Sequence, residues 1–151
     1  MKNNYFIQEW DYTQLGPLPF EADQLAIMRT AEFVNIYGVP MVQMGDYKIE
    51  GLIKITYNNK CIYRKYVGNN DIPEDQCVVL TNRSLAELGI HSKKDFQTPI
   101  LATIEPASSI SYLWHNSYAF IRKPFQWAVS GLLLTILFGI ASVVLGFIAL
   151  I

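Results

Sequence analysis

Hydrophobic and polar positions divide the 151-residue chain into two unlike parts. The last charged residue is Lys123, and none of the 27 residues from Phe125 to Ile151 carries a side-chain charge. Of these 27 residues, 20 are hydrophobic. As a helix with ~1.5 Å of rise per residue, this segment is about 40 Å long, enough to span a bilayer with some tilt. The pattern therefore predicts one transmembrane helix over residues 124–151.

The clearest local pattern in the first 124 residues is a β-hairpin. The runs Leu52–Tyr57 and Lys60–Val67 are separated by Asn58-Asn59, a pair that tolerates the positive φ of a two-residue turn. Alternate residues of a strand point to opposite faces, so one face of this hairpin is mainly apolar. We expect the following side chains to point into the core: Ile53, Ile55, Tyr57, Ile62 and Tyr66.

The other face of the hairpin is polar, and we expect it to be solvated. Cys61 lies on this face and should therefore be more accessible than cysteines usually are. The face, with an arginine at its edge, is also the best candidate for binding an anion or small ligand, although such charged faces are more commonly only solvated. The candidate residues are Lys54, Tyr63, Arg64 and Lys65.

Further segments predict helices and short strands around the hairpin. A helix is predicted over residues 20–37, and a shorter helix over Asn82–Leu88, with Thr81 or Asn82 as its cap and Gly89 closing it. Short strands are predicted at residues 5–10, 77–80 and 100–104. The fold class that follows for residues 1–107 is α+β, a small antiparallel sheet or partly closed β-barrel with flanking helices.

Residues 108–123 predict an amphipathic juxtamembrane helix between the domain and the membrane segment, with Ser108 or Ser109 as its N-cap. Its aromatic residues resemble an interfacial belt. The helix can lie at the lipid headgroups, dock against a membrane partner, or form the last core helix of the domain, and the sequence leaves these alternatives open. The candidate interface residues are Ile110, Leu113, Trp114, Tyr118, Ile121, Arg122, Lys123 and Trp127.

Small residues recur along the predicted transmembrane segment at helical spacing. Such a stripe lets two helix backbones approach closely, and Ser or Thr can add hydrogen bonds between helices. Small residues are also common in membrane helices in general, but their regular spacing favours a packing face. This predicted face consists of Ala128, Gly131, Thr135, Gly139, Ser142, Gly146 and Ala149.

The charged residues next to the apolar segment predict how the chain is oriented in the membrane. The formal net charge is −1, and the N-terminal residues contain no apolar stretch, so we expect no secretory signal there. Arg122 and Lys123 directly precede the apolar segment, and the positive-inside rule places them, with the domain before them, in the cytoplasm. The arrangement predicted is a single-pass tail anchor with a cytosolic N-terminal domain.

Motifs for catalysis, cofactors or metals are not evident in the sequence. The two cysteines, Cys61 and Cys77, are 16 residues apart with no CxxC spacing, and no phosphate-binding loop, nucleophile elbow or zinc motif is present. The longest basic runs are pairs, which argues against a nucleic-acid partner. We therefore expect no catalytic residue, cofactor or metal, and a non-enzymatic protein.

Two functional hypotheses follow. The first is an accessory or regulatory subunit of a membrane protein complex, whose transmembrane helix packs against a partner helix. The alternative is a membrane-anchored sensor or effector whose soluble domain binds a ligand and whose transmembrane helix self-associates. In both, the partners are the lipid bilayer and either another membrane protein or a second copy of the chain.

Overall fold

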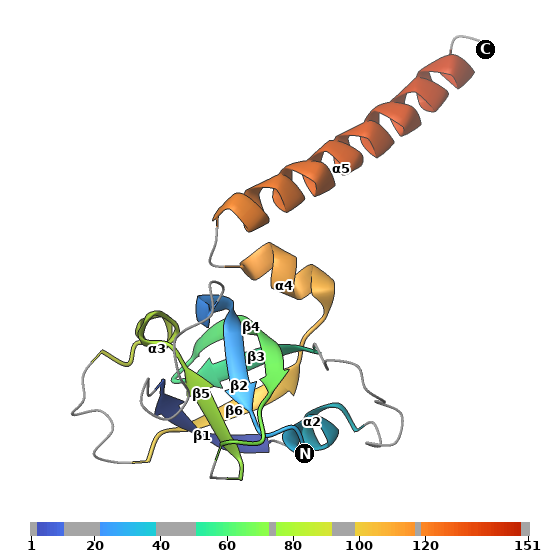
Figure 1. The fold of residues 1–151 in the computed structure, drawn as a ribbon. Helices are drawn as coiled ribbons and strands as arrows, with labels where there is room; N and C mark the ends of the chain where they lie inside the picture. Colours follow the sequence, from blue (N-terminus) through green and yellow to red (C-terminus); the bar gives the residue numbers. More distant parts are fainter. Residues whose placement is uncertain are drawn as a thin grey trace. The chain divides into compact units, whose positions relative to one another are not determined.

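The computed structural model describes residues 3–10, 22–38, 51–72, 75–91, 99–116 and 119–148 (Figure 1). The chain groups into two compact units, Met1–Tyr112 and Leu113–Ile151. Six strands and short helices make up the first unit, whereas the second is dominated by one long helix.

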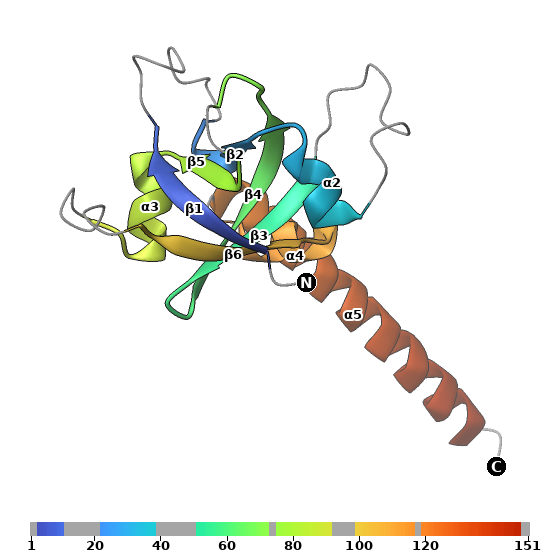
Figure 2. The same cartoon turned by 90° about the horizontal axis from the view of Figure 1, so that it is seen from below.

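The strands of the first unit form a closed barrel, seen from a second side in Figure 2. Around the barrel their order is β1-β5-β2-β4-β3-β6. The pairs β1–β5 and β2–β4 are parallel, and the other four pairs are antiparallel. The strands are β1 (Asn3–Glu9), β2 (Leu25–Met28), β3 (Gly51–Tyr57), β4 (Lys60–Gly68), β5 (Cys77–Leu80) and β6 (Leu101–Pro106).

The α+β class predicted from the sequence is therefore confirmed, while the sheet differs from the expected one. We expected an antiparallel sheet or a partly closed barrel, and the structure has a closed, mixed barrel. The parallel pairs arise because β1 and β2 join strands from the second half of the domain instead of their neighbours in sequence. Closure leaves none of these six described strands with an unpaired edge.

The barrel is a repeat of one strand pattern. Its pairing scheme is unchanged when each strand number is advanced by three, so that β1 becomes β4, β2 becomes β5 and β3 becomes β6. The helices α2 (Glu32–Tyr37) and α3 (Asn82–Leu88) also correspond, because α2 follows β2 and α3 follows β5. Each helix ends at a glycine in the left-handed conformation, Gly38 (φ 67°) and Gly89 (φ 85°).

The strand registers show which residues are counterparts in the two halves. Strands β2 and β5 are both four residues long, so Leu25 corresponds to Cys77. Leu25 pairs with Lys65 of β4, and Cys77 pairs with Phe6 of β1. The residues that precede these partners, and are buried, are therefore counterparts as well: Tyr5 and Arg64.

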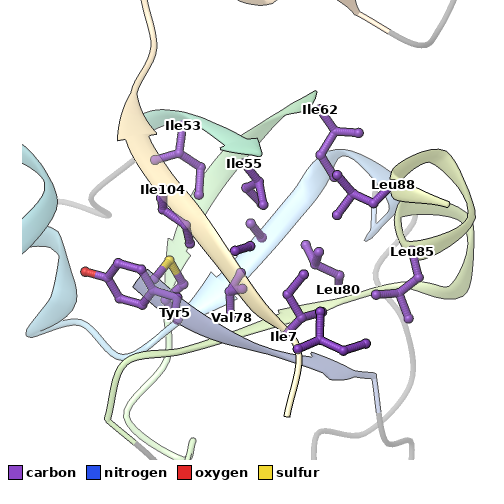
Figure 3. Packing of buried hydrophobic residues seen from close by; sticks show 14 of the residues in the cluster. Tyr5, Ile7, Ile53, Ile55, Ile62, Val78, Leu80, Leu85, Leu88 and Ile104 are labelled. Atoms are coloured by element: carbon purple, nitrogen blue, oxygen red, sulfur yellow. The ribbon is translucent and has the colours of Figure 1, made fainter. Parts of the chain in front are cut away.

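The main core fills the barrel. Figure 3 shows apolar side chains from opposite strands pointing toward one another, with Leu85 and Leu88 of α3 closing one side. A second, smaller cluster packs around β2 and β5 and contains Trp10, Ile27, Ile72, Cys77 and Val79. As a result β5 is buried along its whole length.

The predicted hairpin is confirmed in detail. β3 and β4 pair with Ile55 opposite Ile62, and the turn residues Asn58 (φ 44°) and Asn59 (φ 63°) both have positive φ. The residues expected in the core are buried, apart from Tyr57, which packs partly buried against it. Cys61 is exposed, as expected.

The second predicted helix and the three predicted short strands are present in the structure. The helix Asn82–Leu88 is present, Thr81 is its cap, and the hydroxyl of Thr81 accepts from the N–H of Ser84 at 3.4 Å. Strands were also found close to the three predicted segments, as β1, β5 and β6.

The helix predicted over residues 20–37 is wrong for most of its length. A 3₁₀ turn, η1 (Ala22–Gln24), is followed by the strand β2, and only Glu32–Tyr37 is α-helical, while residues 20 and 21 lie outside the described part of the chain. The run Leu25–Met28 pairs with both β4 and β5, and its last three residues are buried. A short, continuously apolar run has no periodicity that separates strand from helix.

The predicted juxtamembrane helix over residues 108–123 also differs from the structure. Helix α4 covers Ser109–His115, and a second helix, α5, covers Ala119–Ile148 and runs through Pro124. Residues 117 and 118 lie outside the described part. Pro124 is the sixth residue of α5 and has no N–H to donate to the carbonyl of Phe120, so α5 lacks one helical hydrogen bond there.

Candidate functional site

Helix α5 is the one helix in the described part of the chain that is long and apolar enough to cross a membrane. It has 30 residues, its most apolar window has a mean hydropathy of 2.5, and no part of that window is buried. Its large side chains, from Leu132 to Ile148, are exposed along the helix. The described residues 124–148 of the predicted transmembrane segment are therefore part of one continuous helix of spanning length.

The predicted packing face lies along α5, except for Ala149, which is outside the described residues. A Cβ atom added at Gly131, Gly139 or Gly146 would meet no atom within 4 Å, so this side of the helix is open. Thr135 and Ser142 each donate their hydroxyl to a carbonyl one turn earlier, at 3.0 and 2.8 Å. Both hydroxyl hydrogens are therefore bonded within α5. A neighbouring helix could use this face for close packing and could donate hydrogen bonds to the two hydroxyl oxygens.

Helix α4 begins at the Ser108 cap, which settles the choice between Ser108 and Ser109. The Ser108 hydroxyl accepts from the N–H of Ser111 at 3.1 Å. The residue of α4 that is buried is Tyr112, whose hydroxyl donates to Oε1 of Gln24 at 2.8 Å. Tyr112 is not among the candidate interface residues, and its hydroxyl attaches this side of α4 to Gln24.

The candidate juxtamembrane residues fall into three groups. Ile110 and Trp114 of α4 are exposed, by 69% and 40%, and Trp127 of α5 is exposed by 76%. Leu113, Ile121 and Arg122 are half-buried, and Lys123 is exposed. Tyr118 lies outside the described residues. The structure therefore leaves exposed the aromatic and apolar residues best suited to an interface.

Within the second unit, Trp114 lies against the start of α5. Its ring meets that of Phe125 edge-on, with 6.1 Å between centroids and 89° between planes. The side-chain amide of Gln126 donates to the carbonyl of Trp114 at 3.4 Å. These contacts connect α4 to the first residues of the uncharged segment.

The polar face of the hairpin contains three of its four candidate residues. Lys54, Tyr63 and Lys65 are half-buried on the outer surface, and the Lys54 ammonium lies 3.8 Å from a carboxylate oxygen of Glu105. Arg64 does not belong to this face. It stands between Tyr63 and Lys65 on β4, so the alternation of a strand turns it to the opposite side, where it is only 3% exposed.

Arg64 instead connects β4 to α3. Its guanidinium donates to the Ser84 hydroxyl at 2.9 Å, to a carboxylate oxygen of Glu87 at 2.6 Å and to the carbonyl of Tyr63 at 2.9 Å. Ser84 in turn donates to the carbonyl of Asp23 at 3.2 Å. The network attaches η1 and α3 to the barrel.

In the first half of the barrel, the carboxylate of Glu32 on α2 binds Tyr5, as the carboxylate of Glu87 on α3 binds Arg64 in the second half. The Glu32 carboxylate accepts from the hydroxyl of Tyr5 at 3.0 Å, from the amide of Asn35 at 2.9 Å and from the N–H of Gln76 at 3.1 Å. Burial, then the charge of Glu32 and the hydrogen bond to it, raise the pKa of Tyr5 well above its usual range. Tyr5 therefore stays a protonated donor at neutral pH.

Neither network was found from the sequence. Glu32 is one carboxylate within a predicted helix, and no local pattern links it to Tyr5 or Gln76. For Arg64 a signal exists, because alternation from the buried Ile62 already points its side chain inward. Among the described residues, every buried side-chain nitrogen or oxygen has a hydrogen-bond partner.

Comparison with known proteins gives distant structural neighbours, two of which are designed proteins. No family model and no curated protein matches the chain. The rationally designed protein mkDPBB_sym_86 is similar with a TM-score of 0.46 and 13% identity, over 71% of this chain and 94% of that one. The computationally designed protein msDPBB_sym2 has a TM-score of 0.46 and 12% identity, over 69% and 96%.

Proposed function

We propose that the chain is a non-enzymatic accessory or regulatory subunit of a membrane protein complex. In this proposal α5 is a single-pass transmembrane helix, the barrel domain lies in the cytoplasm, and the small-residue face of α5 packs against a helix of the partner. The observation that carries the proposal is α5 itself, a long apolar helix whose large side chains are exposed. Such a surface needs lipid or protein around it.

The charges at the start of α5 support the proposed orientation. Arg122 and Lys123 are the last charged residues before the uncharged segment. Basic residues next to a transmembrane helix are retained on the cytoplasmic side. The barrel precedes them in the chain and therefore lies on the same side.

The small residues along one side of α5 support a helix partner. Gly131, Gly139 and Gly146 recur at intervals of seven or eight residues, and none has a neighbouring atom where a Cβ would be. Two helices gain packing contacts in lipid when small residues let their backbones approach. A rod needed only for anchoring requires no such face.

The hydrogen bonds of the barrel's buried polar groups support the proposal of a non-enzymatic protein. Arg64, Glu32 and Tyr5 are all engaged in attaching helices or turns to the barrel. The outer face of the hairpin offers Lys54, Tyr63 and Lys65 for contacts with another protein or an anionic ligand.

The test is co-purification of the full chain from its native membrane in mild detergent. We expect a larger membrane protein to accompany the wild type, and the variant Gly139→Ile to lose it, because the added side chain holds the two backbones apart. The matched control is Ala141→Ile, which adds similar bulk about 200° around the helix. Migration of the wild type as a lone monomer contradicts the proposal, and a complex of identical chains favours the self-associating sensor.

A further inference from the structure

Helix α4 has two unlike sides. Tyr112 is 5% exposed and its hydroxyl is bound to the buried Gln24, which ties this side to the barrel unit. Ile110 and Trp114 are spaced i and i+4, so they share the opposite side, where they are 69% and 40% exposed. An isoleucine and a tryptophan are therefore exposed on the side of α4 that does not carry Tyr112.

Within the second unit, Trp114 contacts the first turns of α5. The ring of Trp114 packs edge-on against Phe125, the second residue after the last charge of the chain. If α5 enters the bilayer there, Trp114 lies at the same depth as Phe125. An indole ring, apolar but with one N–H donor, is the side chain most typical of that interfacial depth.

The charge of the surrounding segment has one sign. No acidic residue follows Glu105 in residues 106–151, and Arg122 and Lys123 are the only lysine and arginine there. A surface with exposed apolar groups, two cations and no anions complements a layer of anionic phospholipid headgroups.

We propose that α4 is a second membrane contact, lying in the headgroup layer of an anionic phospholipid bilayer. Ile110 and Trp114 face the acyl boundary, and Arg122 and Lys123 bind lipid phosphates. The inference rests on the proposed transmembrane role of α5 and adds to it a lipid class and a second contact.

The experiment measures thiol reactivity of the purified full chain in vesicles of phosphatidylcholine, with or without phosphatidylglycerol. The reagent is a charged, water-soluble maleimide, and the background variant is Cys61→Ser, which leaves the buried Cys77. Ile110→Cys reports on α4, Ala86→Cys on the exposed surface of α3, and Leu137→Cys on the middle of α5. Continued protection of Cys77 shows that the barrel is folded.

We expect Leu137→Cys to be protected in both lipids and Ala86→Cys to react in both. In anionic vesicles Ile110→Cys should react at least ten-fold more slowly than Ala86→Cys. Each cation near an anionic surface is worth roughly five-fold in partitioning, so Arg122→Gln with Lys123→Gln should remove up to about 25-fold of protection.

Three results overturn the inference while leaving α5 in the bilayer. In the first, Ile110→Cys reacts as fast as Ala86→Cys although Leu137→Cys is protected. In the second, protection is equal in both lipids and is unaffected by the charge variants. In the third, protection grows with the ratio of protein to lipid, which identifies contact between copies. A reactive Leu137→Cys overturns the proposed function itself.

Discussion

Tyr5 and Arg64 occupy equivalent positions in the two halves of the barrel, and each donates a hydrogen bond to a carboxylate on the helix of its own half. Tyr5 binds Glu32 of α2 at 3.0 Å, and Arg64 binds Glu87 of α3 at 2.6 Å. The same position on the first strand of each half thus fixes the helix that follows, by a neutral donor in one half and by an ion pair in the other.

This equivalence predicts that Arg64 contributes to the stability of the barrel. We expect Arg64→Ala to lower the free energy of unfolding by about 2–3 kcal/mol, because hydrogen bonds to charged groups are lost and Ser84 loses its buried donor. Denaturant unfolding of the full chain in detergent measures the change. The neighbouring Lys65→Ala, on the outer face, should change it by less than about 0.5 kcal/mol.

A loss equal to that of Lys65→Ala would show that Arg64 does not hold α3 to the barrel. Binding of an anion that is lost in Arg64→Ala but kept in Lys65→Ala would instead assign Arg64 to the ligand face.

The tyrosines around Glu32 predict a loss of stability at high pH. Burial raises the pKa of Tyr66 to about 12 from its ordinary value of 10. The folded state then holds the proton more tightly than the unfolded state, so stability is full below pH ~10 and falls as the pH rises from about 10 to 12. The expected loss across this range is about 2–3 kcal/mol, measured by unfolding at successive pH values.

In Tyr66→Phe this part of the slope should disappear. Burial also raises the pKa of Tyr37, so some alkaline loss should remain in the variant. An unchanged slope in Tyr66→Phe would contradict the assignment.

The position of Gly51 at the start of β3 has no room for a larger side chain. A Cβ at this position would overlap the ring and hydroxyl of Tyr37, which donates to the carbonyl of Leu52 at 2.6 Å. Gly51→Ala should therefore displace Tyr37 and cost about 1–3 kcal/mol of stability. In the double variant with Tyr37→Ala the overlap is absent, so the penalty of Gly51→Ala should largely vanish. Equal penalties in both backgrounds would refute the overlap.

The accuracy of the sequence predictions follows from how local each signal is. The hairpin was correct because Asn58-Asn59 and the alternation around it lie within sixteen consecutive residues. Strand β2 was missed because four apolar residues have no period of their own, and their partners in β4 and β5 are distant in sequence. Closure of the barrel depends on these distant pairings and could not be read from local pattern.

The candidate site shows the same contrast. The long apolar helix was evident from composition, and α5 confirms it as a helix. Tyr112 was not predicted as the buried residue of α4, because its partner Gln24 lies far away in the chain and leaves no local pattern. The alternation of strand residues was sufficient to predict that Arg64 points inward. Arg64 was nevertheless assigned to the ligand-binding face because it is charged.

The native cysteines provide a test of orientation. Cys61 is exposed on the barrel and Cys77 is buried, so only Cys61 should react with a charged thiol reagent. If the barrel is cytoplasmic, Cys61 is protected in intact cells and is labelled once the membrane is permeabilised. Labelling in intact cells would place the barrel on the outer side and contradict the orientation given by Arg122 and Lys123. The variant Cys61→Ser controls for labelling at Cys77.

The account depends most on α5 holding the chain in a bilayer, and washing native membranes with alkaline carbonate tests this directly. A helix that spans the hydrocarbon layer resists this wash, whereas a protein attached only to the surface is released. We expect the full chain to remain in the membrane pellet. Its release into the supernatant, with a known transmembrane protein retained in the same pellet, would contradict the membrane-tethered account.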